Sequence, residues 1–244
     1  VVAFVALVPA LAALALAAAA GKAAAARAPP PAPRVGTARR LAQEARRIGD
    51  SHNPDDPFFA AFRARTLAQY GVSRVEDLPV NYRGLVSAEG EALTARLFAH
   101  YATRTADTQR AQSRWMQVAA VFSPALAVRQ TSMAGAATDL ETHVRFLDQA
   151  EAYRFDLIQR LNQVHAEQVQ AADDAARSRD AEAERRTRVA AQTWADLPEF
   201  RFRPATPETR AASMVPGLVV LAGWLVVVLG LLLPAARRLE EDAR

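Results

Sequence analysis

The chain has 244 residues with 30 basic and 26 acidic side chains, and it contains no cysteine, which excludes disulfides and thiolate metal sites. Acids and bases are interspersed rather than clustered, so the charge pattern predicts solvated helical faces and argues against a nucleic-acid-binding protein. Long uncharged, apolar stretches lie near the two ends. This uneven distribution predicts a membrane protein.

The first predicted element is a transmembrane helix over residues 1–20, which carry no charged or polar side chain. Roughly 20 apolar residues in a helix match a hydrocarbon core ~30 Å thick. A secretory signal peptide is the alternative, because small residues precede Gly21. No Met and no basic segment precede Val1, which favours an internal span, so we expect the chain to begin inside a longer protein.

Residues 21–36 form a predicted linker, because the stretch APPPAPRVG favours stiff polyproline geometry. A helical domain is then expected over residues 37–205. Its first helix, over residues 37–51, is amphipathic and flanked by arginines. This helix either packs on the domain or lies on lipid headgroups.

The next predicted helix begins after Asp55-Asp56-Pro57 and ends at Gly71. A capping-box match over residues 73–76 predicts a further helical turn. Residues 79–84 are predicted to form a turn-rich connection, and residues 89–121 are predicted to form one long helix because apolar residues recur near helical spacing without proline.

Residues 115–128 are apolar apart from a few polar positions and are interrupted by Ser123-Pro124, which makes them too short to cross a bilayer as a straight helix. The stretch is either buried core or an interfacial segment that touches lipid. Pro124 either begins a new helix in its first turn or kinks a continuing one.

A second capping-box match over residues 138–141 predicts the start of the strongest amphipathic helix. Its apolar face is wider than a coiled-coil seam, with residues in 3–4 spacing at Leu140, Val144, Leu147, Ile158 and Leu161.

Polar residues on or near this apolar helix are the candidate site. Glu151, Arg154 and Asn162 would need partners if buried, so they indicate either an interhelical polar network or an opening toward substrate. Thr138 and Asp139 are the other positions at which we expect substrate contacts, because they lie near the apolar Ser123-Pro124 segment.

Residues 171–193 are polar and predict a solvated helix or helical hairpin, with Glu182–Arg186 and Glu184–Arg188 as i,i+4 ion pairs. The neighbouring Asp173 and Asp174 are expected to be solvated. Residues 197–208 predict an extended, proline-bounded run.

The last transmembrane helix is predicted over residues 206–235, with an uncharged apolar run at residues 214–233 that Pro234 closes. Residues 236–244 form a short tail that begins with Arg237 and Arg238. Basic residues in short tails favour the cytoplasm, so the tail is expected to be cytoplasmic. Two spans in series would place the helical domain on the extracytoplasmic side.

No catalytic pattern is present in the sequence. The chain has no Walker A motif and one lysine, and its four histidines form no HExxH or HxxxH pair. The three methionines are isolated, which argues against a copper site. We therefore expect no enzyme activity, no bound cofactor and no metal.

Several strings in this order carry a resemblance: PAPRV after a membrane helix, PVNYRGL, FSPALAVRQTSMAGAATDLETHVRFLDQAEAYRFDLIQRLN, and PEFRFRP before a last membrane helix. The chain resembles the C-terminal portion of bacterial ABC transporter permeases of the type-2 exporter class, in a family related to multicopper-enzyme-maturation permeases. The resemblance covers nearly the whole chain. It assigns no established catalytic or binding residue.

The resemblance implies an all-α membrane protein in which two transmembrane helices, the penultimate and the last, bracket a large helical domain that faces the periplasm. It implies a non-catalytic subunit of an exporter in the bacterial inner membrane, with a separate cytoplasmic ABC ATPase that uses ATP and a second permease copy or paralogue as partners. The alternative is a membrane-anchored extracytoplasmic helical module that binds or scaffolds a partner without transport.

Overall fold

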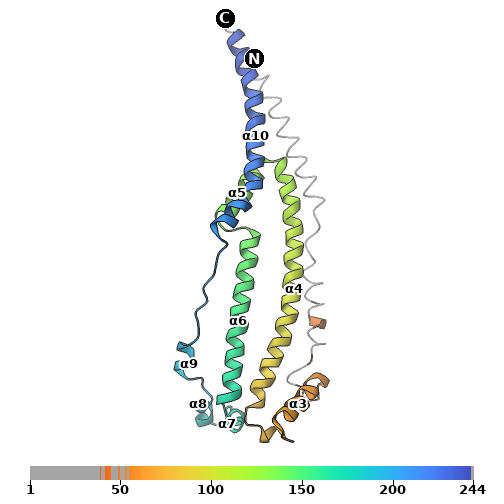
Figure 1. Cartoon of the computed structure of the whole chain (residues 1–244), viewed down its shortest axis with the longest axis vertical. Helices are drawn as coiled ribbons and strands as arrows, with labels where there is room; N and C mark the ends of the chain where they lie inside the picture. The colour runs from red at the N-terminus through yellow and green to blue at the C-terminus, as the bar shows by residue number, and fades with distance from the viewer. Residues whose placement is uncertain (1–38, 40–41, 45–48, 50–52, 54, 243–244) are drawn as a thin grey trace. The chain divides into compact units, whose positions relative to one another are not determined.

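The computed structural model describes residues 39, 42–44, 49, 53 and 55–242 (Figure 1). All regular elements in this part of the chain are helices, which confirms the predicted all-α class there. The predicted span over residues 1–20, the linker over residues 21–36 and most of the helix over residues 37–51 lie outside the described residues. The bracket of two spans therefore stays a prediction.

The described residues divide into two compact units. Unit 1 holds residues 105–146 and those from 203 onward, and unit 2 holds residues 147–202 together with the described residues up to 104. Two long helices, α4 (Tyr82–Val121) and α6 (Leu140–Gln168), contribute to both units. Each unit has its own internal contacts and is described separately.

Unit 2 begins with helix α3 (Pro57–Tyr70), whose two ends are fixed by local chemistry. Asp56 Oδ1 accepts hydrogen bonds from the amides of Phe58 at 3.0 Å and Phe59 at 3.3 Å. Gly71 ends the helix in the left-handed conformation, with φ 68°, which glycine adopts without steric cost. Both predicted boundaries are confirmed.

The short 3₁₀ turn η1 (Val75–Asp77) follows α3, but the predicted capping box does not form. The N-cap residue is Arg74, and no side chain caps the turn. Glu76 instead accepts a hydrogen bond from the Arg74 guanidinium at 3.3 Å. Because its carboxylate is used by Arg74, the reciprocal Ser73–Glu76 arrangement is lost.

Helix α4 begins at Tyr82, seven residues before the predicted start at residue 89. Asn81 caps it, because its Oδ1 accepts the amide of Arg83 at 3.0 Å. Residues 82–84 are therefore helical, and the predicted turn-rich connection over residues 79–84 is wrong there. A Cβ on Gly84 would overlap the backbone of Ala166, so glycine lets α4 approach α6 closely.

Helix α6 begins at Leu140, and its cap differs from the prediction by one residue. Asp139 Oδ1 accepts the amide of Thr142 at 3.0 Å. The Thr138 hydroxyl donates instead to the Met133 carbonyl at 3.4 Å, near the end of helix α5 (Pro124–Gly135). The capping box with Thr138 as the cap is therefore wrong, because its hydroxyl is used by the preceding helix.

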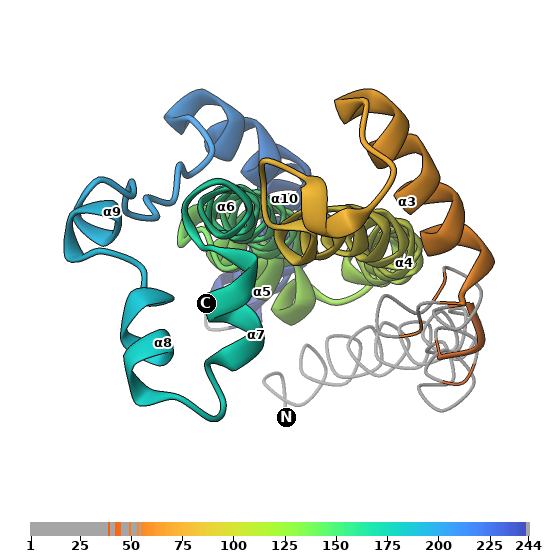
Figure 2. The ribbon, with the colours of Figure 1, turned by 90° about the horizontal axis from the view of Figure 1, so that it is seen from below.

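Three short helices follow α6 where one solvated helix or hairpin was predicted: α7 (Ala171–Ala176), α8 (Ala181–Arg186) and α9 (Ala191–Ala195), seen in Figure 2. The predicted Glu184–Arg188 pair is confirmed at 2.9 Å. The predicted Glu182–Arg186 pair is wrong, because Arg186 binds Asp173 at 2.8 Å and Glu182 pairs with Arg185.

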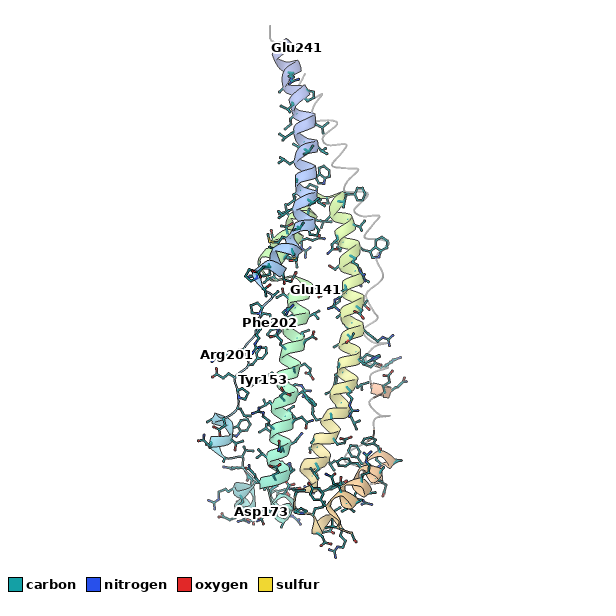
Figure 3. All side chains as sticks on the ribbon, in the orientation of Figure 1. Glu141, Tyr153, Asp173, Arg201, Phe202 and Glu241 are labelled. Atoms are coloured by element: carbon teal, nitrogen blue, oxygen red, sulfur yellow. The ribbon has the colours of Figure 1, made fainter. Side chains whose placement is uncertain are left out.

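Residues 197–206 form the extended run that was predicted, without regular secondary structure. The ring of Phe200 lies 5.5 Å from that of Tyr153 on α6. Figure 3 shows Tyr153 beside this segment, near Arg201 and Phe202. An aromatic contact therefore holds the extended run against α6 within unit 2.

Unit 1 is built on helices α5 (Pro124–Gly135) and α10 (Pro207–Asp242), which pack against each other. Pro124 occupies the first turn of α5, so the first of its two predicted roles is confirmed. A Cβ on Gly217 of α10 would overlap Thr131 Oγ1 of α5, and Gly135 lies against Met214. Small residues thus set the distance between these helices.

Helix α10 begins as predicted, with Thr206 Oγ1 accepting the amide of Thr209 at 3.3 Å. It continues through Pro216 and Pro234 to Asp242, beyond the end of the predicted span over residues 206–235. Among the described residues, α10 is the one helix long and apolar enough to cross a membrane, and none of its apolar window is buried. By length and composition, α10 could span a bilayer.

Candidate functional site

The most buried charged group in the described part of the chain is Asp174 of α7, which is 2% exposed. Its Oδ2 accepts a hydrogen bond from the Asn81 side-chain amide at 3.3 Å and lies 3.0 Å from His165 Nε2. Because a carboxylate accepts, the imidazole donates from this nitrogen. The residues come from the start of α4, the end of α6 and α7, so one carboxylate joins three segments of unit 2.

Two arginines complete the surroundings of this carboxylate. Arg177 Nη1 lies 3.5 Å from Oδ1 of Asp174, and Arg83 Nη1 lies 3.8 Å from Oδ2. Burial by itself raises the pKa of Asp174, but the hydrogen bonds from His165 and Asn81 and the charge of Arg177 outweigh it, so the pKa lies below its ordinary value. Asp174 is therefore a charged carboxylate at neutral pH.

The backbone reinforces the same junction. The amide of Asn81 donates to the Ala166 carbonyl at 2.7 Å, while the side chain of Asn81 binds both Arg83 N and Asp174. One asparagine thus caps α4, closes the last turn of α6 and holds the buried carboxylate. We call Asn81, His165 and Asp174 the clamp. Its role is structural, because Asp174 Oδ2 and the Asn81 donors all bind partners within the domain.

A cavity of about 660 Å³ adjoins this clamp in unit 2. His165 and Asp174 line one part of it, and other lining residues are Phe59, Arg63, Tyr82 and Arg83. Burial is the main cause that raises the pKa of the Tyr82 phenol. Arginine side chains around a buried carboxylate give the cavity a polar, cationic rim.

The predicted network on α6 forms in part. Arg154 contacts Glu151 on its own helix at 2.7 Å and Glu91 of α4 at 2.6 Å. The hydrogen bonds that Arg154 donates lower the pKa of Glu151, and the carboxylates of Glu151 and Glu91, which accept them, raise the pKa of Arg154. A nearby hydrogen bond from Gln159 to the Ala88 carbonyl, 3.0 Å long, also joins α6 to α4.

The other predicted site residues lie elsewhere. Asn162 lines a separate cavity of about 510 Å³ in unit 2, beside Gly84, Gln159 and Ala166. Thr138 and Asp139 serve the ends of α5 and α6 in unit 1. The structure therefore joins Glu151 to Arg154, adds Glu91, and brings neither Asn162 nor the Thr138–Asp139 pair into that ion cluster.

Unit 1 has its own charged contact at the start of α6. Arg110 of α4 donates from Nε and Nη2 to the two oxygens of Glu141, at 3.0 and 3.1 Å; Glu141 is labelled in Figure 3. Hydrogen bonds to Glu141 are the main cause that raises the pKa of Arg110. This bidentate pair has the geometry in which arginine binds carboxylates most strongly.

Sequence reasoning missed the clamp of Asn81, His165 and Asp174. It placed Asp174 on a solvated helix, which is wrong, because the structure buries this side chain. The Asn81 cap carried a usable signal, since asparagine is favoured just before a helix. In the described part of the chain, no group of three or more metal-ligating residues is present.

The sequence profile of the family described as "Domain of unknown function (DUF3526)" matches residues 37–203. The chain belongs to the DUF3526 family. The DUF3526 match includes the Asp174 clamp and the Arg154 cluster, and it ends shortly before α10. Comparison of this DUF3526 chain with curated proteins gave no match, and comparison with solved structures gave none either.

Proposed function

We propose that this DUF3526 chain is a non-catalytic transmembrane part of an ABC exporter permease, which couples ATP hydrolysis by a separate cytoplasmic ATPase to substrate translocation. The observation that carries the proposal is α10, an apolar helix joined directly to the DUF3526 domain. Its large side chains face outward, with Val226 70% exposed and Val219 64% exposed. Lipid is the environment in which such a surface is stable.

The topology of the proposal follows from the flanks of α10. Arg237 and Arg238 follow the apolar run, and basic residues in a short tail favour the cytoplasmic side. The DUF3526 domain precedes α10, so it would lie on the opposite, periplasmic face of the bacterial inner membrane. A partner ATPase would then bind cytoplasmic segments of the full-length protein, together with a second permease copy or paralogue.

The chemistry of the domain supports a non-catalytic part. Asp174 binds Asn81 and His165, and Arg154 binds Glu151 and Glu91. These polar groups are used for contacts between segments of the fold, where they stabilise a single arrangement of the helices. Energy for transport would come from the partner, and the domain would move as a unit or guide substrate.

Membrane integration of α10 is the first test, made on the full-length protein in its native membrane. The change Val226→Arg places a charge near the centre of the apolar run and should cost about 3 kcal/mol of insertion free energy. A tag placed beyond α10 should therefore become accessible to a protease added on the periplasmic side, because a tail that α10 fails to carry across stays on that side. Gly223→Ala is the matched control on α10, because nothing lies within 4 Å of the added Cβ.

Association with an ATPase is the second test. Full-length protein purified in mild detergent should bring down a cytoplasmic ATPase, and reconstituted complexes should hydrolyse ATP. An integrated protein that brings down no ATPase would contradict the permease proposal and favour the anchored scaffolding module. Full extraction of the unaltered protein by carbonate would contradict both.

A further inference from the structure

The turn between α4 and α5 lies beside the middle of the apolar run of α10. Trp224 Nε1 donates to the Val121 carbonyl, the last residue of α4, at 3.0 Å. Trp224 is ten residues beyond Met214, where the uncharged run begins, which is about 15 Å along a helix. That length is half of a hydrocarbon core ~30 Å thick.

The packing of α5 on α10 confirms this register. Thr131 of α5 lies against Gly217 of α10. Pro124, at the start of α5, is seven residues before Thr131, and Trp224 is seven residues after Gly217. Because both helices rise by the same amount per residue, antiparallel packing brings the start of α5 level with Trp224. Figure 1 shows α5 beside the lower part of α10.

We infer that residues 115–128, the end of α4 and the start of α5, form a hairpin that enters the lipid bilayer beside α10 and turns back near its middle. The inference rests on the proposed membrane span of α10, and its occupant is the hydrocarbon of the bilayer. The outward side chains fit this occupant, since Trp115, Val118, Val121, Phe122 and Val128 are all exposed.

Charged residues flank the hairpin on both sides and are absent within it. Between Arg114 and Arg129 the sequence WMQVAAVFSPALAV contains no charged residue. Both arginines are about 8 to 10 Å from the tip along their helices, and arginine side chains reach back toward headgroups from such depths. Trp115, next to Arg114, is of the type enriched at the membrane interface.

One polar side chain of the hairpin, that of Gln117, is exposed and borders a cavity of unit 1. Gln117 lines a cavity of about 510 Å³ inside unit 1, together with Gln130, Thr131 and Gly217. Polar groups at membrane depth are stable when they face such an interior.

The backbone at the tip is also suited to lipid, where polar groups need partners within the protein. Phe122 N donates to the Ala119 carbonyl at 3.1 Å and Ser123 N to the Ala120 carbonyl at 3.1 Å. The Val121 carbonyl is bound by Trp224. The Ser123 carbonyl accepts from two amides of α5, those of Leu126 and Ala127, and Pro124 has no N–H to satisfy.

Depth-dependent fluorescence quenching tests the inference on the full-length protein in phosphatidylcholine vesicles. Single cysteines at Phe122, Val128 and Val118 would carry a bimane label, in a background without other cysteines. Phospholipid brominated near the middle of its acyl chains is the quencher. The Phe122→Cys label should lose as much fluorescence as a Val226→Cys label on α10, and the Val118→Cys label should lose less.

Phe98→Cys is the matched control, because Phe98 is also a large exposed side chain on α4 but lies in unit 2. Its label should be unaffected by brominated lipid and should react with a membrane-impermeant thiol reagent before labelling. Quenching at Phe98 equal to that at Phe122 would overturn the inference, because insertion would then not be limited to the hairpin.

The outcomes separate the two proposals. Quenching at Val226 but not at Phe122 or Val128 would overturn the hairpin inference and leave the span of α10 intact. Absence of quenching at all these positions would overturn both. A Phe122 position that neither brominated lipid nor the thiol reagent reaches would also overturn the inference, since protein rather than lipid would then cover it.

Discussion

The two units of the chain differ in the chemistry that stabilises each of them internally. Unit 2 uses charged and amide side chains, with Asp174 and Arg154 each binding groups from separate segments. Unit 1 brings α5 and α10 together through Gly135, Gly217 and Thr131, and leaves large apolar side chains on its surface. Polar junctions suit a domain in water, whereas close small-residue packing is typical of helices in lipid, where hydrophobic burial contributes little to association.

The largest expected effect separates a fully buried aspartate from a partly buried one in unit 2. Asp174→Ala leaves Asn81 and His165 without their acceptor, and it should lower the free energy of unfolding by about 3 kcal/mol. The measurement is thermal unfolding in mild detergent followed by circular dichroism. Asp173→Ala is the control, because this neighbouring residue pairs with the exposed Arg186 side chain, and it should change stability less. Equal effects of the two changes would contradict the stabilising role of the Asp174 clamp in unit 2.

The next effect compares glycines in the two units. Gly84→Ala and Gly217→Ala each place a Cβ into a neighbouring helix, so each should destabilise its helix pair by about 2 kcal/mol despite the better helix propensity of alanine. Gly223→Ala adds a Cβ in open space and should be neutral or slightly stabilising. Proteolytic sensitivity of each unit, mapped by mass spectrometry, would show whether the loosening stays in the unit that carries the change.

A smaller effect is expected for the partly exposed Arg154. Arg154→Ala removes the ion pairs with Glu91 and Glu151, and solvent screening limits the loss to about 1 kcal/mol. Arg96→Ala is the control on α4, because Arg96 Nε donates to the Ala92 carbonyl of its own helix. A double change of Arg154 and Glu91 should cost less than the sum of the single changes, and strict additivity would contradict the contact.

Acid should weaken unit 2 gradually. The pKa values of Asp174 and Glu151 are lowered in the folded chain, so the unfolded chain binds more protons as the pH falls. Their contribution is present above the ordinary carboxyl pKa of about 4 and is lost as the pH falls through the folded values. Unfolding measured from pH 7 downward should show this loss, and Asp174→Asn should flatten it. An unchanged pH profile in that variant would rule out Asp174 as a source.

The features that the sequence predicted correctly depend on neighbours in the chain. Asp56 begins α3 and Gly71 ends it, because a cap and a left-handed residue each act within one turn of the helix. The extended run over residues 197–206 follows from its prolines. Such signals need no knowledge of the fold.

The features that the sequence could not predict depend on distant partners. The Asp174–Asn81 hydrogen bond joins residues 93 positions apart, and nothing near Asp174 in the chain distinguishes it from its less buried neighbour Asp173. Thr138 failed as the cap of α6 because the end of α5 takes its hydroxyl. The Arg154 cluster was half predicted, since Glu151 is one helical turn away while Glu91 lies on another helix.

Pro216 gives α10 a mechanical property of its own. Because proline has no N–H, the helix lacks the hydrogen bond that would join residue 216 to the Ala212 carbonyl. The contacts of α5 with Met214 and Gly217 lie on both sides of this position. Contacts with α5 therefore support α10 at Pro216. A shift of α5 away from these contacts would let α10 bend more easily at that point.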